Sequence, residues 1–108
     1  MRDRLCDLSD LAEAVSEIYA SRFGILRDDL WYLAKLGEEV GELNGAWLSL
    51  NGRGRDRGRA PEELKAALAD EAADVLAMLL LIARKNDIDL AAALWRKWGR
   101  HLTAADAR

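Results

Sequence analysis

Apolar residues recur along this chain at intervals of three and four positions, the spacing that places side chains on one face of an α-helix. No stretch alternates apolar and polar residues as a half-buried β-strand does. Proline occurs only once, and alanine and leucine dominate the apolar positions. The pattern predicts an all-α fold, a four-helix bundle with helices near residues 9–22, 29–50, 61–85 and 89–102.

Residues that commonly begin and end helices stand at the edges of these segments. Ser9 and Asp89 are suitable N-caps for the first and last helices. The other boundary signals are Asp28 or Asp29 and Pro61 at helix starts, and Asn51-Gly52 and Asn86 at helix ends. With 108 residues, we expect residues 1–108 to form a single domain.

Composition narrows the classes of function. The net charge of −3 does not favour a nucleic-acid-binding protein, which normally presents a basic face. The single cysteine, Cys6, cannot form an intrachain disulfide or a cysteine-based zinc site. The longest apolar run, Val75–Ala83, is far shorter than the roughly 20 residues of a membrane-spanning helix, and no signal peptide is visible. We therefore expect a cytoplasmic protein that binds neither nucleic acid nor a membrane.

The segment 51–60 combines three glycines with four arginines. It is open to two interpretations: a mobile loop that contacts phosphate, or a solvated connection between the second and third helices. Charge runs are usually hydrated, which favours the connection.

Acidic residues cluster on the second and third helices. Spacings of three and four place them on one helical face, where like charges repel. In the third helix Glu71 falls inside the apolar stripe and Asp74 at its edge, and carboxylates in a core are costly unless their charge is compensated. Lys35 is the main nearby cation in the second helix. The carboxylates are Glu38, Glu39 and Glu42 in the second helix and Asp70, Glu71 and Asp74 in the third.

Two antiparallel helices joined by a short loop can bring four of these carboxylates together: Glu39, Glu42, Glu71 and Asp74. An all-oxygen site suits Mg²⁺, or Mn²⁺, rather than zinc. A carboxylate-bridged di-iron site is disfavoured because it uses Glu-x-x-His pairs, and the only histidine, His101, reads as a surface residue near the C-terminus. The alternative is two solvated acidic faces without a metal.

The two acidic segments resemble the MazG-like, all-α nucleoside triphosphate pyrophosphohydrolases. Residues 35–43 read KLGEEVGEL, similar to that family's K-L-x-E-E-x-G-E-L, and residues 70–76 read DEAADVL, similar to its D-E-x-x-D-V-L. Residues 88–94 also resemble the family's segment that leads to the last helix. The likeness therefore covers roughly residues 25–100. In the last helix, Trp95 stands where the family often has asparagine and Trp98 where it has phenylalanine, while Lys97 is kept and the arginine position falls on His101, beside Arg100.

The resemblance implies a hydrolase acting on phosphoric anhydride bonds, which cleaves a (d)NTP or related nucleotide between the α and β phosphates to (d)NMP and pyrophosphate. It implies Mg²⁺, or Mn²⁺, held by Glu39, Glu42, Glu71 and Asp74. Glu38 is the candidate for orienting or deprotonating the attacking water. Lys35, Lys97 and Arg100 are the candidate substrate contacts.

Two other functions stay open at this point. A phosphoribosyl-ATP pyrophosphohydrolase-like enzyme shares the fold and the carboxylates. A non-catalytic helical regulatory module would keep the fold without turnover, but would not need all four carboxylates.

Large apolar residues predict further packing. We expect Trp47 and Trp98 to lie in a core or an interface, and Trp31 less so. Because Val75–Ala83 is apolar on all sides, that part of its helix should be covered all round. We therefore expect a homodimer or homotetramer that associates through this helix, as the resemblance also implies.

Overall fold

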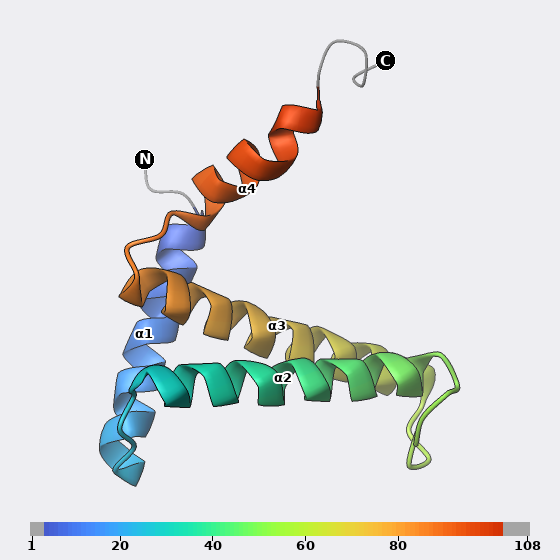
Figure 1. The fold of residues 1–108 in the computed structure, drawn as a ribbon. Helices are drawn as coiled ribbons and strands as arrows, with labels where there is room; N and C mark the ends of the chain where they lie inside the picture. Colours follow the sequence, from blue (N-terminus) through green and yellow to red (C-terminus); the bar gives the residue numbers. More distant parts are fainter. Residues whose placement is uncertain (1–3, 103–108) are drawn as a thin grey trace.

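The structure, a computed structural model, describes residues 4–102. This part of the chain forms four α-helices and a short 3-10 helix and contains no β-strand, which confirms the all-α prediction (Figure 1). The predicted ranges 29–50 and 61–85 coincide with the second and third helices. The elements are α1 (Arg4–Phe23), α2 (Asp29–Leu50), α3 (Pro61–Lys85), α4 (Leu90–Trp98) and the 3-10 helix η1 (Gly99–His101).

Local hydrogen bonds account for the boundaries of α2, α3 and α4. The Asp28 carboxylate accepts from the backbone N–H of Trp31 at 2.9 Å and caps α2, and Asp89 caps α4 in the same way. Pro61 occupies the first position of α3, where its missing N–H costs nothing. At the other end of α3, the side-chain amide of Asn86 donates to the carbonyl of Ile82 at 2.8 Å.

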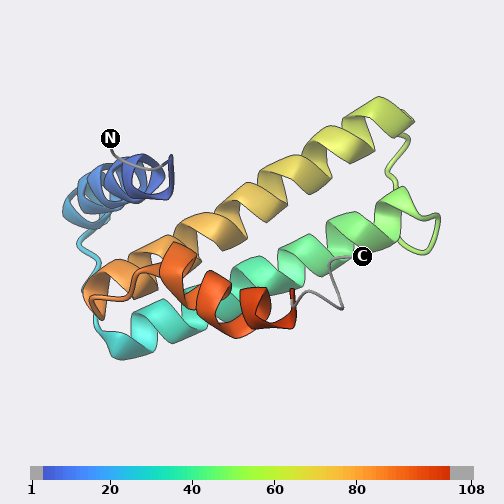
Figure 2. The ribbon, with the colours of Figure 1, turned by 90° about the horizontal axis from the view of Figure 1, so that it is seen from above.

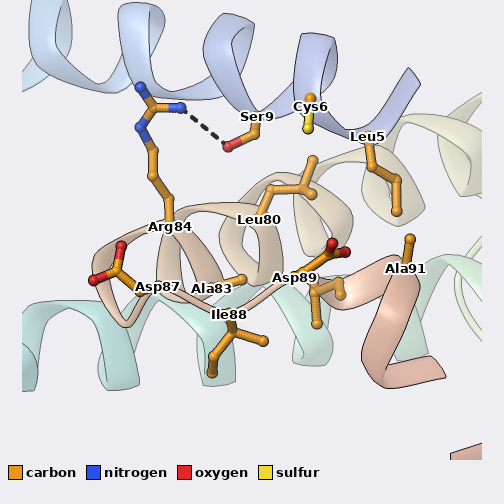
Figure 3. A pocket seen from close by; sticks show the side chains of 11 residues that line it. Leu5, Cys6, Ser9, Leu80, Ala83, Arg84, Asp87, Ile88, Asp89 and Ala91 are labelled. Atoms are coloured by element: carbon orange, nitrogen blue, oxygen red, sulfur yellow. Dashed lines mark hydrogen bonds between the residues drawn. The ribbon is translucent and has the colours of Figure 1, made fainter. Parts of the chain in front are cut away.

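Two predicted boundaries were wrong. The first helix begins at Arg4 instead of near Ser9, because Leu5 and Leu8 extend its apolar stripe by a further turn. Ser9 lies inside α1, where its hydroxyl accepts a hydrogen bond from Arg84 at 3.3 Å (Figure 3). The last helix does not continue as an α-helix to residue 102: after Trp98 the chain tightens into η1.

The core lies where the three long helices meet. α2 and α3 form an antiparallel hairpin, and α1 crosses it near the start of α2 and the end of α3 (Figures 1 and 2). Tyr32, Met78 and Leu81 are buried at this crossing, with the partly buried Trp31 packed against them. Of the tryptophans, it is therefore Trp31 that joins the core, whereas Trp47 and Trp98 are exposed within the chain.

The apolar run Val75–Ala83 is largely covered within the chain. Its buried members, Met78, Leu80, Leu81 and Ala83, lie in the stretch of α3 that α1 and α2 flank. Leu76 and Leu79 stay exposed. Coverage by α1, which the sequence pattern did not foresee, removes part of the reason for expecting association through this helix. Within the described range, none of the helices has the length and apolar character needed to span a bilayer.

α4 projects away from the other helices. It continues from the end of α3 away from the hairpin and packs mainly against its own extension, η1 (Figure 1). A cavity of about 370 Å³ lies where α4 begins. It is lined by residues of α1, the end of α3 and the α3–α4 connection, among them Cys6, Ala83 and Asp89 (Figure 3). The radius of gyration is 17.0 Å, whereas a compact domain of this length has about 13 Å.

A bidentate ion pair ties α1 to the connection that follows it. The Arg27 guanidinium donates to both carboxylate oxygens of Glu13, at 2.9 and 3.1 Å, and also to the Ser16 hydroxyl at 3.0 Å. Both charged side chains are mostly buried. The hydrogen bonds from Arg27 hold the pKa of Glu13 below its usual value of 4.5.

The lowered pKa of Glu13 predicts an acid-sensitive contribution to stability. The contribution is complete above the pKa that Glu13 has in the unfolded chain and is lost as the pH falls through its lower folded value. We expect Glu13→Gln to reduce the free energy of unfolding by about 1 kcal/mol at neutral pH, and the difference from wild type to vanish in acid. Urea titrations at several pH values measure this. Glu62→Gln, an exposed substitution in the first turn of α3, is the control, and an equal pH dependence of both variants would disprove the role of the pair.

Candidate metal centre

Four carboxylates meet between α2 and α3. Glu39 and Glu42 lie one turn apart on α2, and Glu71 and Asp74 lie one turn apart on α3. One oxygen atom from each of the four lies within 4.8 Å of the others. Glu39 and Glu71 are half-buried, whereas Glu42 and Asp74 are exposed, so the cluster extends from the helix interface to solvent. We call these four residues the acidic cluster.

The hairpin explains why these residues meet. Because α2 and α3 run antiparallel and pack along their lengths (Figure 2), a pair of acidic residues in the middle of one helix faces a pair in the middle of the other. In α3, Glu71 lies on the same stripe as Leu64 and Met78, which are buried. The apolar contacts of that stripe therefore hold a carboxylate at the interface between the helices.

The buried part of the acidic cluster is not satisfied by the protein. Glu39 Oε2 and Glu71 Oε2 are inaccessible to solvent and have no hydrogen-bond partner. The Glu39 side chain exposes only 12% of its surface. An unpaired carboxylate oxygen in such a place is costly, and buried charges in proteins are normally paired or coordinate a metal.

The electrostatics of the acidic cluster follow from this geometry. Burial raises the pKa of Glu39, and the neighbouring carboxylates Glu42 and Asp74 raise it further. Burial likewise raises the pKa of Glu71, together with its contacts with Glu42 and the charge of Asp74. The negative charge at the cluster therefore lacks sufficient compensation from within the protein.

Lys35 supplies part of the missing positive charge. Its Nζ lies 3.7 Å from Glu39 Oε1 and 3.2 Å from Glu38 Oε1. Burial alone would lower the pKa of Lys35, but the hydrogen bond to Glu38 and the charges of Glu38, Glu39 and Glu42 raise it overall. One ammonium group facing four clustered carboxylates leaves a net negative site.

A divalent cation fits this donor set. All the ligands are carboxylate oxygens, which hard cations such as Mg²⁺, Mn²⁺ and Ca²⁺ prefer and which zinc sites rarely use alone. A cation bound here would pair the two inaccessible oxygens that have no hydrogen-bond partner, Glu39 Oε2 and Glu71 Oε2. The exposed side of the cluster, at Glu42 and Asp74, leaves access for water and a ligand.

The other residues predicted from the sequence differ in how close they lie to the acidic cluster. Glu38 is next to the acidic cluster in sequence but outside it in space: its side chain is 54% exposed and pairs with Lys35. Lys97 and Arg100 are exposed on α4 and η1, which make little contact with the helices that carry the cluster. His101 is exposed on η1, as expected. Within one chain the structure therefore brings Lys35, but not Lys97 or Arg100, to the cluster.

Sequence reasoning missed the groove that adjoins the acidic cluster. This groove, of about 920 Å³, lies between α1 and α3, and Lys35, Glu39 and Asp74 are among the residues that line it. We call it the α1–α3 groove. The sequence signal that could have indicated it is the set of alanines that interrupt the apolar stripes of its two walls, Ala12 and Ala20 on α1 and Ala73 and Ala77 on α3.

Comparisons with known proteins add no relative to this description. The chain matches no protein-family model, and no curated protein or solved structure is significantly similar to it. The candidate metal centre is therefore defined by its own geometry.

Proposed function

We propose that this chain is a Mg²⁺-dependent nucleotide pyrophosphohydrolase that cleaves a (d)NTP or related nucleotide between its α and β phosphates. The observation that carries the proposal is the acidic cluster, in which four carboxylates converge and two buried oxygens lack any partner. The motifs that supply these residues, Glu39-x-x-Glu42 and Glu71-x-x-Asp74, are those that resemble the MazG-like pyrophosphohydrolases. Both lines of support concern the same four residues.

The acidic cluster would hold the cation, with Mg²⁺ as the expected ion and Mn²⁺ as a substitute. When bound, a divalent cation neutralises phosphate charge and increases the acidity of water. The exposed edge of the cluster, at Glu42 and Asp74, is where a triphosphate can approach. Lys35 lines the adjoining groove and offers an ammonium group to a phosphate oxygen.

In the hydrolysis, the oxygen of a water molecule bonds to the α-phosphorus, and the bond from that phosphorus to the α–β bridging oxygen breaks. The electron pair of the broken bond leaves with pyrophosphate, and a proton of the water passes to a general base. Glu38 is our candidate for this base, because its exposed carboxylate accepts a hydrogen bond from Lys35, whose Nζ also lies 3.7 Å from Glu39 Oε1. A general base of this kind contributes roughly 10²–10⁴-fold to the rate.

Metal binding predicts a specific pattern of thermal stability. In a chelator, Glu71→Gln should melt at a higher temperature than wild type, because it removes a buried carboxylate repelled by its neighbours. Adding Mg²⁺ at about 100 times its Kd should raise the melting temperature of wild type by roughly 10 °C, and that of Glu71→Gln hardly at all. Thermal unfolding followed by circular dichroism measures both effects.

The matched control is Asp70→Asn, which removes the exposed neighbouring carboxylate outside the acidic cluster. It should keep the Mg²⁺ response of wild type. A wild-type melting curve that is unchanged by millimolar Mg²⁺ or Mn²⁺ would contradict the metal site.

The proposed chemistry predicts release of pyrophosphate. We expect the wild-type chain to release it from one or more members of a (d)NTP panel in the presence of Mg²⁺, and Asp74→Asn to require far more Mg²⁺, because a ligand charge has been removed. Phosphoribosyl-ATP belongs in the panel, since preferential cleavage of it would identify the related histidine-pathway type of activity. Absence of pyrophosphate from every substrate would contradict the proposal and favour a non-catalytic helical module.

Glu38 gives a separate test of the mechanism. Glu38→Gln should lower kcat by roughly 10²–10⁴-fold, while the Mg²⁺-dependent rise in melting temperature persists. Steady-state kinetics at saturating Mg²⁺ measure the first effect. Near-normal turnover in Glu38→Gln would remove Glu38 from the mechanism and leave the metal proposal intact.

A further inference from the structure

The connection between α2 and α3 concentrates positive charge in an otherwise acidic protein. Residues 51–60, which we call the arginine loop, carry four arginines and one aspartate, a net charge of +3, so the rest of the chain carries −6. The overall charge of −3, on which the expectation of no nucleic-acid partner rests, therefore combines two regions of opposite sign. The arginines are Arg53, Arg55, Arg57 and Arg59, and all four are exposed.

The arginine loop lies apart from the acidic cluster. It forms the end of the α2–α3 hairpin opposite the crossing with α1 (Figure 1). The last residues of α2, 43–50, carry no charge, and they place about 12 Å of helix between Glu42 and the loop. Because the Debye length is about 10 Å in 0.1 M salt, the charge of the acidic cluster is largely screened at the loop.

Hydrogen bonds fold the arginine loop back onto the end of α2. The backbone N–H of Arg53 donates to the Leu48 carbonyl at 2.8 Å, and the Ser49 hydroxyl donates to the Arg55 carbonyl at 2.6 Å. Gly54 lies so close to Ser49 that an added Cβ would come within 3.1 Å of the Ser49 backbone nitrogen. The backbone that carries the arginines is therefore anchored to the last turn of α2.

The one carboxylate of the arginine loop does not neutralise its arginines. The Asp56 side chain accepts a hydrogen bond from the backbone N–H of Gly58 at 2.9 Å, and Arg59 Nε donates only to the Asp56 carbonyl. Within the described range, no ion pair joins a carboxylate to any of the four guanidinium groups. Arg27, by contrast, pairs with Glu13. The loop therefore offers uncompensated guanidinium groups to an anion.

The backbone conformation of Arg57 is unfavourable for a simple connection between helices. Its φ is 54°, in the left-handed region, and the next residue, Gly58, has a φ of 75°. Glycine adopts this region freely, whereas a residue with a Cβ does so at a cost. A segment that only joined two helices would be better served by glycine at position 57. Residues held in such conformations are concentrated at ligand-binding segments.

An exposed aromatic side chain adjoins the arginine loop. Trp47, on the last turn of α2, exposes 56% of its surface. Its carbonyl accepts hydrogen bonds from the backbone and the side-chain amide of Asn51, the first residue of the loop. Guanidinium groups bind phosphates in a bidentate manner, and the bases of a single strand stack on aromatic rings and on guanidinium planes. Arginines beside an exposed indole therefore match both parts of a nucleotide unit.

We propose that the arginine loop binds the phosphodiester backbone of a single-stranded nucleic acid, with Trp47 as the stacking surface for a base. A duplex fits less well, because its major groove is read by a helix or a β-ribbon and this segment is neither. A membrane surface also fits less well, because interfacial segments insert large apolar side chains, and residues 51–60 contain none. An acidic peptide would pair with the arginines but would supply no base to stack on Trp47.

Fluorescence anisotropy of short labelled RNA and DNA single strands, measured in a chelator, tests the binding. The logarithm of the association constant should fall with the logarithm of salt concentration with a slope of about −2.8, since each phosphate contact to a single strand contributes about −0.7. Replacing Arg53 and Arg55 together by glutamine should make the slope shallower by about 1.4. The control replaces Arg4 and Arg22, two exposed arginines of α1, and should leave it unchanged. Absence of binding to either strand at low salt, or equal effects of the two double variants, would overturn the proposal.

The same assay tests the stacking surface. Trp47→Ala should weaken binding by roughly tenfold, because a base–aromatic contact is lost, whereas Trp47→Phe should keep most of the affinity. Leu33→Ala is the control, because Leu33 is a 67% exposed apolar residue of α2 that precedes the acidic cluster in sequence, and it should bind as wild type does. Wild-type affinity in Trp47→Ala would overturn the placement of a base on Trp47.

Arg57→Gly separates a binding role from a purely structural one. This variant should melt no lower than wild type, because glycine tolerates the positive φ, yet it should bind the single strand more weakly. Thermal unfolding and anisotropy on the same samples measure both effects. A melting temperature at or above that of wild type together with unchanged affinity would overturn the role of Arg57.

Competition identifies the class of partner. An unlabelled single strand should displace the labelled one at a lower concentration of charge than a polyglutamate peptide or anionic phospholipid vesicles. Equal or better displacement by polyglutamate would overturn the proposal in favour of an acidic protein, and by vesicles in favour of a membrane surface. None of these measurements uses a metal or hydrolysis of a nucleotide. A chain without turnover can therefore still pass them, and an active enzyme can fail them.

Discussion

Four carboxylates converge between α2 and α3, and two of their buried oxygens have no hydrogen-bond partner, so the packing of these helices works against an electrostatic cost. The packing of α2 against α3 holds Glu39 and Glu71 at the helix interface, where burial and neighbouring charges raise the pKa of both side chains. Only six residues of the described chain are buried, and they are the apolar residues that keep this hairpin and α1 together. A small core therefore maintains an electrostatically unfavourable arrangement, which is the usual situation at a ligand or metal site rather than at a merely structural contact.

The exposed apolar surface of α1 adjoins the same site. Glu39 and Asp74 are among the residues that line the α1–α3 groove, and Lys97 lies exposed on α4. Two deficits thus coincide: negative charge that lacks compensation and apolar surface that lacks cover. A cation held within the cluster, as we propose, would pair the buried oxygens that the protein leaves unsatisfied.

Local signals in the sequence were sufficient to predict the bounds of α2 and α3 and the convergence of the four carboxylates. Asp28, Pro61 and Asn86 define helix ends through their own backbone or side-chain chemistry, and a three-residue spacing on two antiparallel helices brings acidic pairs face to face. The start of α1 could not be predicted in this way, because Ser9 suits a cap but lies within the helix. The exposure of Trp47 and Trp98 could not be predicted from the sequence either. Periodicity shows that a helix has an apolar face, but not which element, or which chain, covers that face.

Direct titration of the protein with Mn²⁺, followed by the electron paramagnetic resonance signal of the free ion, tests the proposed cation at the acidic cluster most directly. The wild-type chain should remove Mn²⁺ from solution with a stoichiometry of at least one ion per chain, Mg²⁺ should compete for the same site, and a chain in which Glu39 and Asp74 are both replaced by their amides should leave the free signal unchanged. If the wild-type and amide chains gave the same free Mn²⁺ signal throughout the titration, the four carboxylates would not form a metal centre.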